Sequence, residues 1–442
     1  MTEGSAFLRR ARALKALALQ SIWGMAEYFA YPLFMFVATP FFLIQLGKQQ
    51  YGQWMLVLAF NGLGGLIGLG MGAAALKEVS THRGRGDLAA ASHALRACFA
   101  VSLVSSVGLV MLTALSVPFV DDVLLAKIGE PQSIRSLTGF ALALIMIEQI
   151  DTVFAGALRG MERFDLAAKI EICLKFAVVL ISAAVAFATH DLVMLLTAVL
   201  VAHLARAFVK ASFAMALLGT GNLWPVWDTR YVTEAIRFGK WTWLQLIGGA
   251  LYSTADRLLV GSFLGAGALA DYSICLQLAQ QVHTVPAAGA GFMFPMVSRK
   301  LAAGESVLKV AVYGMLVFGA GALALAAPIF LFGHWILSVW IGEAFAAQNL
   351  GVLQLLAAGF VLLALNIGPH YFLLGSDGAH VVAWSNIASG VIALCAGLYA
   401  IPRLHLDGAA IMRLIYALAL SAPMIGIFIF DLAKRQETAR PH

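Results

Sequence analysis

Residues 192–218 have the sequence LVMLLTAVLVAHLARAFVKASFAMALL, which is long and apolar enough to cross a membrane as one helix. A helix needs about 20 predominantly apolar residues to traverse the hydrocarbon core of a bilayer. The ionisable side chains in this run are His203, Arg206 and Lys210. Because such groups are costly inside a membrane, they predict a paired or functional role for these three residues.

The rest of the chain has the same character. It contains 442 residues, of which 61% are hydrophobic and only 12% are charged, against about 25% charged in soluble domains. The mean hydropathy is +0.87, which excludes a soluble globule and a disordered protein. The four cysteines lie within apolar runs, so a secreted disulfide scaffold is excluded as well. We therefore expect an integral membrane protein.

Apolar runs of spanning length recur along the whole sequence. We predict twelve spans, at about residues 17–43, 55–76, 94–120, 136–158, 170–188, 192–218, 241–264, 269–296, 307–341, 350–374, 381–401 and 409–430. At about 25 residues each they use roughly 300 residues, which leaves no room for a soluble domain. The fold class is thus predicted to be an all-α polytopic membrane protein with twelve transmembrane helices.

The distribution of Lys and Arg predicts the orientation. If both termini are cytoplasmic, 19 of the 29 basic residues lie on the inside, with Lys210 near the inner end of the sixth span counted among them; 6 others lie within spans and 4 lie outside, namely Lys48, Lys127, Arg135 and Arg403. This split follows the positive-inside rule. The net charge of +6 is therefore a topology signal, and no nucleic-acid partner is inferred from it.

Several dipeptides recur at one constant shift in residue number and at equivalent span ends. Leu46-Gly47 corresponds to Leu264-Gly265, Val79-Ser80 to Val297-Ser298, and Gly86-Asp87 to Gly304-Glu305. Such a repeat predicts two six-helix lobes, residues 1–218 and 219–442. Because six is an even number, the lobes are parallel, and parallel repeats place a substrate path in a central cavity between them.

Two stretches of the sequence resemble the Wzx-type flippases, the polysaccharide-biosynthesis members of the multidrug/oligosaccharidyl-lipid/polysaccharide exporter superfamily. One is the first-span end, where Leu46-Gly47 is followed by Tyr51-Gly52. The other is the seventh-span region, with the residues Phe238-Gly-Lys-Trp-Thr-Trp, Tyr252, Asp256-Arg257-Leu-Leu-Val-Gly261, Leu264-Gly265 and Tyr272. In span number and half-repeat layout the resemblance covers the whole chain.

The resemblance implies a multi-pass transporter of the bacterial inner, or cytoplasmic, membrane. The implied cargo is an undecaprenyl-pyrophosphate-linked oligosaccharide repeat unit that moves to the periplasmic leaflet by alternating access, with H⁺ or Na⁺ as candidate coupling ions. It implies the polysaccharide polymerase machinery as a partner, no cofactor and no enzymatic activity. The lipid II flippase branch usually carries two additional spans, so a peptidoglycan precursor is a poorer match.

The cations of the sixth span are candidates for binding this cargo. His203, Arg206 and Lys210 are spaced i, i+3, i+7, which places them on one helical face. Such a stripe can receive a pyrophosphate through charge-assisted hydrogen bonds. Alternatively, the longer side chains snorkel to the inner headgroups.

The fourth span carries the candidate ion-coupling pair, Glu148 and Asp151. Two carboxylates on one buried face do not ionise together without cost, which suits a site for H⁺ or Na⁺. The alternative is pairing with a cation of a neighbouring span, such as Arg206 or Lys175. Asp256 and Glu27 are the next candidates for coupling.

Three further polar residues within spans are candidates for contacting the cargo. Arg257 is expected to face the lumen, since the family usually has a charged residue there. Asn366 and His370, spaced i, i+4, suit sugar hydroxyls, but hydrogen bonding between helices is the more common use of such residues. Glu171 and Lys175, also i, i+4, are predicted to form a local ion pair.

Other functional classes fit the sequence less well. An ATP-driven pump requires a phosphate-binding loop, and the sequence contains no GxxxxGK[ST] motif. The ten histidines are scattered, which disfavours a zinc site. A glycosyl polymerase or ligase generally needs a large periplasmic loop, and the largest outer loop here is about residues 121–135. A cation-coupled multidrug antiporter of the same superfamily remains the main alternative, and it would favour an acidic or apolar cavity over a cationic one.

Overall fold

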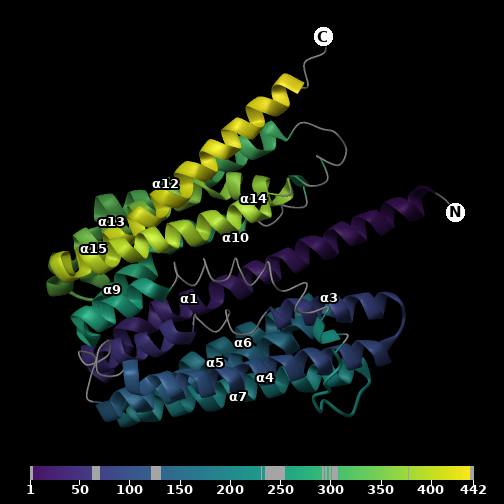
Figure 1. Cartoon of the computed structure of the whole chain (residues 1–442), viewed down its shortest axis with the longest axis horizontal. Coiled ribbons are helices and arrows are strands. Elements are labelled where there is room, and N and C mark those ends of the chain that lie inside the picture. Colours follow the sequence, from purple (N-terminus) through teal and green to yellow (C-terminus); the bar gives the residue numbers. More distant parts are fainter. Residues whose placement is uncertain are drawn as a thin grey trace. The chain divides into compact units, whose positions relative to one another are not determined.

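The structure is a computed structural model (Figure 1). It describes residues 3–61, 70–120, 131–229, 231–233, 254–290, 293, 296–297, 300, 307–376 and 378–438, with side chains described for all of these except 3–29, 31, 61, 109, 112–120, 131–134, 308–309, 311, 379 and 430–438. The helices of the first half are α1 (Glu3–Asn61), α3 (Met71–Gly84), α4 (Leu88–Val120), α5 (Pro131–Gly160), α6 (Phe164–Thr189) and α7 (Leu192–Leu218). Those of the second half are α9 (Ala266–Ala279), α10 (Gln281–Ala288), α12 (Leu308–Trp340), α13 (Glu343–Leu365), α14 (Ile367–Gly375) and α15 (Ala379–Thr438), and residues 254–264 are also helical.

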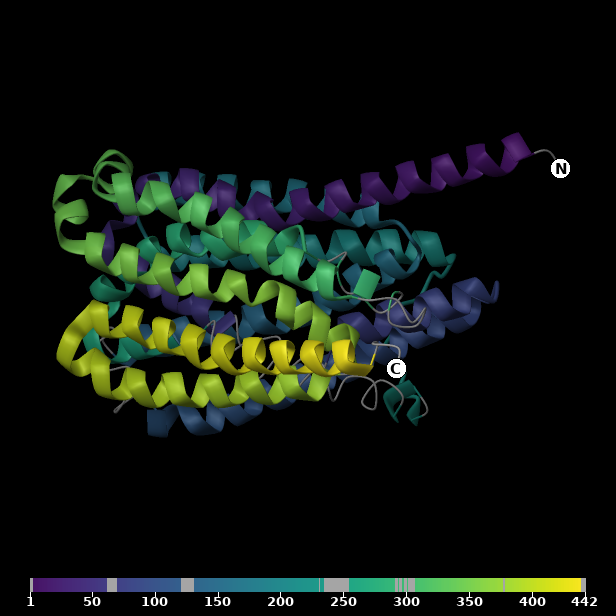
Figure 2. The ribbon, with the colours of Figure 1, turned by 90° about the horizontal axis from the view of Figure 1, so that it is seen from above.

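The helices follow the predicted spans closely. Helix α7 coincides with the sixth span, and α12 with the ninth within one residue. Seven helices within the described residues are long and apolar enough to cross a membrane. One of them, residues 380–429, is twice the length of a span and folds back on itself at His405, where the backbone leaves the helical conformation. Figure 2 shows the two arms of α15 lying side by side. The start of the seventh span, residues 241–253, lies outside the described residues.

Gly47 and Gly265, which correspond in the sequence repeat, have nearly the same backbone conformation. Gly47 interrupts α1 with φ 73° and ψ 167°, and Gly265 precedes α9 with φ 88° and ψ 177°. Both conformations lie in the region that only glycine adopts without strain. Equivalent span ends are thus closed by the same backbone turn.

The chain divides into two compact units, and neither is continuous in sequence. Unit 1 contains residues 1–46, 64–116 and 139–240, and unit 2 contains residues 47–63, 117–138 and 241–442. Within unit 2, Lys48 forms an ion pair with Asp271 at 2.6 Å. A Cβ atom at Gly52 would clash with the carbonyl oxygen of Ala266, so this contact requires glycine. The division of the sequence into lobes 1–218 and 219–442 stays a prediction.

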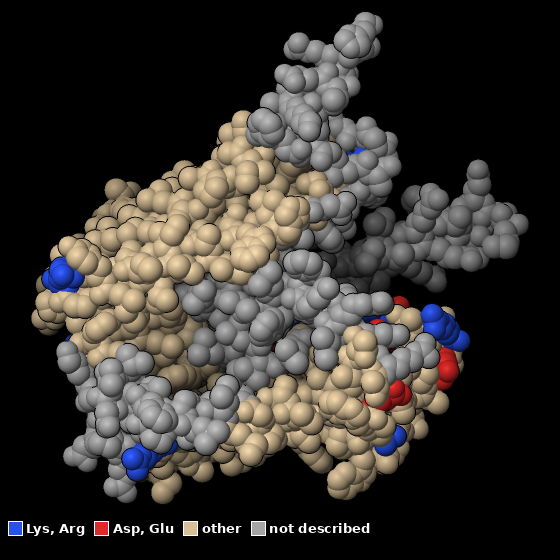
Figure 3. Space-filling view, viewed as in Figure 1, with Lys and Arg blue, Asp and Glu red and all other residues tan. Residues whose placement is uncertain are grey.

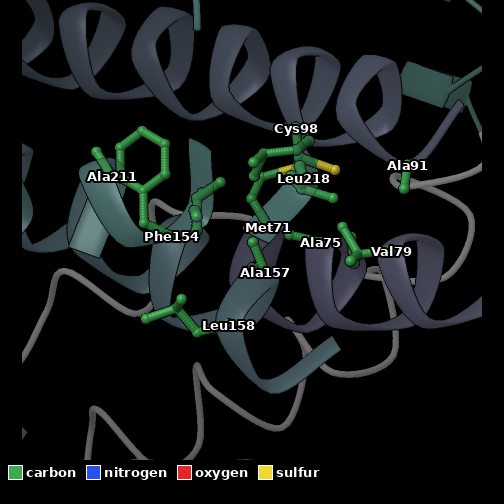
Figure 4. Close-up of a cluster of buried hydrophobic side chains, with 14 of the residues drawn as sticks. Met71, Ala75, Val79, Ala91, Cys98, Phe154, Ala157, Leu158, Ala211 and Leu218 are labelled. Carbon is green, nitrogen blue, oxygen red and sulfur yellow. The ribbon is translucent and has the colours of Figure 1, made fainter. Parts of the chain in front are cut away.

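The core of unit 1 joins α3, α4, α5 and α7. Met71 lies near Cys98 and Leu218 in the centre of this cluster (Figure 4). Helices α3 and α5 approach so closely that a Cβ atom at Gly156 would clash with the Gly72 carbonyl oxygen, and one at Gly160 would lie 2.9 Å from that of Leu76. Small residues four apart are a common way to pack membrane helices backbone to backbone. This contact fixes the position of α5.

Helices α6 and α7 form a tight antiparallel hairpin. His190, with φ 50°, ends α6, and the Asp191 carboxylate caps α7 by accepting a hydrogen bond from the Met194 backbone N–H at 2.8 Å. The His190 ring Nδ1 donates to the Gln45 carbonyl oxygen at 3.0 Å, which ties the hairpin to α1. In unit 2, the main packing is of α13 against α12 and α15.

The exposed side chains are unusually apolar. Val37, Phe208, Leu331 and Val339 are each about 70% exposed or more. In the space-filling view most of the described surface is tan, that is, neither basic nor acidic (Figure 3). A surface of this kind fits a lipid environment.

Candidate functional site

Helices α5, α6 and α7 bring six charged side chains together inside unit 1. The register of the two turns explains why they meet. The turn after Gly160 places Asp151 level with Glu171, and the turn at His190 places Glu171 level with Lys210. By the same count Glu148, Lys175 and Arg206 lie about one helical turn further along. The six residues therefore form two adjacent layers, which we call the α5–α7 network.

Ion pairs connect these residues within and between the layers. Lys210 Nζ lies 2.6 Å from Asp151 Oδ2 and also donates to Glu171. Arg206 donates to Glu148, and its guanidinium lies 3.2 Å from Glu171 and 3.3 Å from Asp151. The remaining cation, Lys175, pairs with a residue of its own helix. Its Nζ lies 3.2 Å from Glu171 Oε1, as the i, i+4 spacing predicted.

The network balances charge but is unevenly buried. Its three carboxylates face three cations, which is what burial of so many charges requires. The side chains of Asp151, Arg206 and Lys210 are 2–4% exposed, whereas that of Glu148 is 31% exposed. Two buried polar atoms, Asp151 Oδ1 and Arg206 Nε, have no hydrogen-bond partner among the described residues. Glu148 is therefore the most exposed side chain of the network.

The structure shows the ion pairing that the sequence offered as the alternative for Glu148 and Asp151. The stripe of Arg206 and Lys210 lies on one face of α7, and it meets the Glu148 and Asp151 face of α5. Pairing of these carboxylates with Arg206 is thus present, and Lys210 also takes part. His203 lies on the same side of α7, and its Nδ1 donates to the Val199 carbonyl oxygen at 2.8 Å.

Glu171 is the member of the network that sequence reasoning missed. The helical spacing alone predicts a pair of Glu171 with Lys175, its neighbour on α6, and no other partner. The missing signal was the hairpin register, because Glu171 and Lys210 lie almost equally far from His190 along the chain, one before it and one after it. Counting outward from the turn would have placed Glu171 beside Lys210.

Unit 2 holds a second buried cluster, centred on Asp256. Its carboxylate accepts hydrogen bonds from Arg413 Nε and from the Tyr272 hydroxyl, and it also accepts from the Arg257 backbone N–H at 2.8 Å. The Arg413 guanidinium lies 5.5 Å from the ring centroid of Phe360. Asp256 and Tyr272 are fully buried. We call Asp256, Tyr272 and Arg413 the Asp256 cluster.

Arg413 and Tyr272 were not among the predicted site residues. Arg413 is far from Asp256 along the chain, and it lies in the last predicted span without any local pattern that marks it. Arg257 itself is half-buried. The sequence indicated only that Asp256 and Arg257 must each find a partner, and for Asp256 that partner is on α15.

The other predicted cargo residues lie where α13 gives way to α14. Asn366 is buried, and its Nδ2 lies 3.0 Å from Met424 Sδ. His370 begins the next turn, and its ring stacks edge-on with Tyr371 at 5.4 Å. Glu27 lies in α1, but its side chain is outside the described residues. Among the residues that the structure describes, no group of His, Cys, Asp and Glu is arranged to hold a metal ion.

A sequence comparison identifies the family. The profile of the family described as "Polysaccharide biosynthesis protein" matches residues 20–301, well over half of the chain. The chain belongs to this family. It is also 21% identical over 398 residues to a Shigella flexneri protein named "Putative O-antigen transporter", a match that covers 88% of this chain and 92% of that protein.

Solved structures with the same fold include a multidrug resistance transporter. An inward-facing MATE family transporter of the MOP superfamily matches with a TM-score of 0.69 at 13% identity, over 94% of this chain and 96% of that chain. A MOP superfamily transporter from Pyrococcus furiosus matches with a TM-score of 0.58 at 15% identity, over 96% of both chains. At this level of identity the likeness shows the fold, which is the predicted two-lobe fold of twelve helices. This polysaccharide biosynthesis family member is a multi-pass membrane transporter.

Proposed function

We propose that this protein moves an undecaprenyl-pyrophosphate-linked oligosaccharide from the cytoplasmic to the periplasmic leaflet of the bacterial inner membrane. The family match and the O-antigen relative support a cargo of this class. Alternating access of the two lobes provides the movement. The observation that carries the proposal is the α5–α7 network, because its buried guanidinium belongs to a spanning helix and has a partly exposed carboxylate as its partner.

The geometry suggests how the network engages an anionic headgroup. Arg206 is already neutralised, so a pyrophosphate must replace one of its carboxylate partners. Glu148 is the partner with the most exposed side chain, and it can turn toward water at the least cost. A pyrophosphate offers the same bidentate match to a guanidinium as a carboxylate does. Exchange of Glu148 for the headgroup thus keeps Arg206 paired throughout.

The same exchange offers a route to ion coupling. A Glu148 carboxylate released from Arg206 lies near Asp151, and the repulsion between them favours uptake of H⁺ or Na⁺. Return of Arg206 to Glu148 after cargo release would expel that cation. Cargo and cation then occupy the network in turn, which is the requirement for driving export with an ion gradient.

Arginine substitutions test the headgroup role. In cells that depend on this transporter, Arg206→Gln should reduce surface polysaccharide by about tenfold or more, a change equivalent to about 1.4 kcal/mol. Arg206→Lys should retain a larger share, because it keeps the charge and loses only the bidentate fork. Normal export by Arg206→Gln at normal protein levels would contradict the proposal. Arg96→Gln is a matched control, because Arg96 lies outside the network and its Nε donates a hydrogen bond to the backbone carbonyl oxygen of Trp224.

The multidrug antiporter remains the second candidate, because the solved structures with this fold include multidrug transporters. The two functions make opposite predictions in one strain. Loss of the protein should abolish surface polysaccharide and leave drug susceptibility unchanged if the cargo is lipid-linked sugar. Unchanged polysaccharide with increased drug susceptibility would favour the antiporter instead.

A further inference from the structure

One contact within unit 2 joins residues from opposite halves of the sequence repeat. Its two sides are residues 48–54, which directly follow the turn at Gly47, and residues 266–272, which directly follow the equivalent turn at Gly265. Both segments are helical, and both belong to unit 2. We call these two segments together the repeat contact. The first half of the sequence thus contributes a segment to the unit that holds most of the second half.

The repeat contact is self-complementary. Lys48 Nζ lies 2.6 Å from Asp271 Oδ2, and a Cβ atom at Gly52 would overlap the carbonyl oxygen of Ala266. Under the repeat shift Lys48 is equivalent to Ala266, and Gln53 is equivalent to Asp271. The counterpart of the ion pair is therefore a contact between positions 53 and 266, and the observed contact of Gly52 with Ala266 is one residue away. A contact in which the two halves exchange partners in this way has two-fold symmetry.

Two-fold symmetry places the repeat contact on the axis that relates the two halves. Gly267 agrees with this position, because a Cβ atom there would lie 3.9 Å from Gln49, its own equivalent in the first half. A residue meets its equivalent only beside the symmetry axis. Parallel repeats are related by an axis along the membrane normal, and the predicted cargo path runs between them along this axis. The repeat contact therefore lies across the predicted path.

The repeat contact lies at the outer end of that path in the predicted orientation. Gly47 and Gly265 follow the first and seventh predicted spans, which both begin on the cytoplasmic side under the positive-inside rule. Lys48 is one of the few basic residues that this rule places outside. Its side chain is 55% exposed, whereas that of its partner Asp271 is 11% exposed. The ion pair is thus at the rim of the repeat contact.

The interactions of the repeat contact are of a kind that can separate and form again. Its interior is apolar, with Tyr51 and Leu269 fully buried. An ion pair with one exposed partner stabilises a contact only weakly. The two backbones touch at Gly52 and Ala266, where close approach depends on small residues and on no buried charge. The Asp256 cluster is different, because its separation would leave a carboxylate buried without its guanidinium.

We propose that the repeat contact is the outer gate of this transporter and that the ion pair of Lys48 with Asp271 is its latch. This assignment rests on the proposed function. With the two segments together, the path is closed to the periplasm. Their separation opens the path and lets the oligosaccharide leave. The gate also explains why position 52 holds a glycine, since any side chain there would prevent closure.

A cleavable crosslink tests the gate directly. In the full-length chain without its native cysteines, Lys48→Cys and Asp271→Cys are joined by a bifunctional thiol reagent with a reducible spacer. Newly made surface polysaccharide should fall by about tenfold or more, equivalent to about 1.4 kcal/mol, and should recover on reduction. The control joins His334→Cys to Glu343→Cys, an ion pair 3.4 Å apart within the second half, and should leave export unchanged. Undiminished export with positions 48 and 271 joined, or an equal loss in the control, would overturn the proposal.

Opening of the gate has a readout that does not depend on transport. Ala266→Cys places a thiol where the side chain is 1% exposed, so a membrane-impermeant reagent reaches it only when the two segments separate. In spheroplasts, adding Lys48→Gln should raise the labelling rate about two- to fivefold, the range that an exposed ion pair supplies. Adding Lys48→Arg should not raise it, because the charge is kept. Equal rates with lysine and glutamine at position 48 would refute the latch, and labelling only in inside-out vesicles would refute an outer gate.

A glycine substitution tests closure itself. Gly52→Ala adds a Cβ atom that overlaps the Ala266 backbone, so it should give the fastest labelling of Ala266→Cys. Gly108→Ala is the control, because a Cβ atom there meets no atom within 4 Å. If Gly52→Ala does not fold, the Lys48→Gln measurement still decides. Failure of the proposed function is seen separately, as surface polysaccharide that persists in cells lacking the protein. Equal labelling in the two alanine variants would overturn the gate alone.

Discussion

The two buried charge clusters of this protein differ in how they are closed. In the Asp256 cluster one carboxylate is held by a guanidinium, a phenol and a backbone N–H, and Asp256 and Tyr272 are fully buried. The α5–α7 network has three carboxylates and three cations in two layers, and Glu148 at its edge is partly exposed. In the first, each partner is needed. In the second, Asp151 and Glu171 each pair with more than one cation, so Arg206 keeps carboxylate partners when Glu148 is exchanged.

This difference supports the proposal of a structural role for the Asp256 cluster and a transport role for the α5–α7 network. Burial of a charge is tolerated when it is paired, and removal of one partner of a sealed pair is costly. The Asp256 cluster therefore fits a fixed brace between the helix at 254–264, α9 and α15. The α5–α7 network has the redundancy and the exposed edge that exchange with a ligand requires.

The largest expected effect is on the sealed cluster. Arg413→Gln leaves Asp256 buried without its guanidinium and should lower the free energy of unfolding by about 3–5 kcal/mol. Thermal unfolding of the purified protein in detergent measures this loss. Arg403→Gln, on the same helix but exposed, is the control and should change little. A stable Arg413→Gln protein would mean that the cluster is not a brace.

A smaller loss is expected when only the phenol is removed. Tyr272→Phe deletes one hydrogen bond to the Asp256 carboxylate and keeps the ring packed, which should cost about 1.5–3 kcal/mol. The same thermal unfolding measurement gives this value. Transport per folded molecule should stay the same, because the cluster braces the fold. Reduced transport at full stability would instead assign Tyr272 to the cargo path.

The exchange role of the network predicts an effect on ion movement. In proteoliposomes with a pH or Na⁺ gradient, the double substitution Glu148→Gln, Asp151→Asn should reduce cation flux by about tenfold or more, equivalent to about 1.4 kcal/mol. The single substitution Glu148→Gln serves if the double variant inserts poorly. Asp87→Asn, at an exposed acid, is the control. Unchanged flux would remove both residues from coupling, and absent flux in the natural chain under either gradient would indicate passive facilitation.

The smallest expected effect concerns the orientation of the chain in the membrane, which decides which side of the membrane the α5–α7 network is nearer. In a chain without its four native cysteines, Gly84→Cys should be shielded from membrane-impermeant thiol reagents in intact cells, and Ser133→Cys should be labelled. A side chain at Gly84 meets no atom within 4 Å, so the substitution should not disturb the fold. Labelling at position 84 in sealed cells would invert the orientation and with it the proposed direction of transport.

The sequence alone determined the spans, and a local property explains why. A run of apolar residues is detected without knowledge of its neighbours, so the limits of α7 and α12 were predicted almost to the residue. The internal repeat was equally visible, because a backbone turn such as that of Gly47 and Gly265 depends on glycine itself. The local pair of Glu171 and Lys175 followed from helical spacing for the same reason.

Only the tertiary structure decided which charges meet. The choice of Arg413 as the partner of Asp256 depends on how α15 packs, and two residues so far apart in the sequence share no period that reveals their contact. Glu171 joined the network because two turns set the register of three helices, a relation between elements that no single element shows. Burial also differs between the two: the same residue types form a fully buried pair of Asp256 and Tyr272 with Arg413 in one unit and a network with a partly exposed edge at Glu148 in the other.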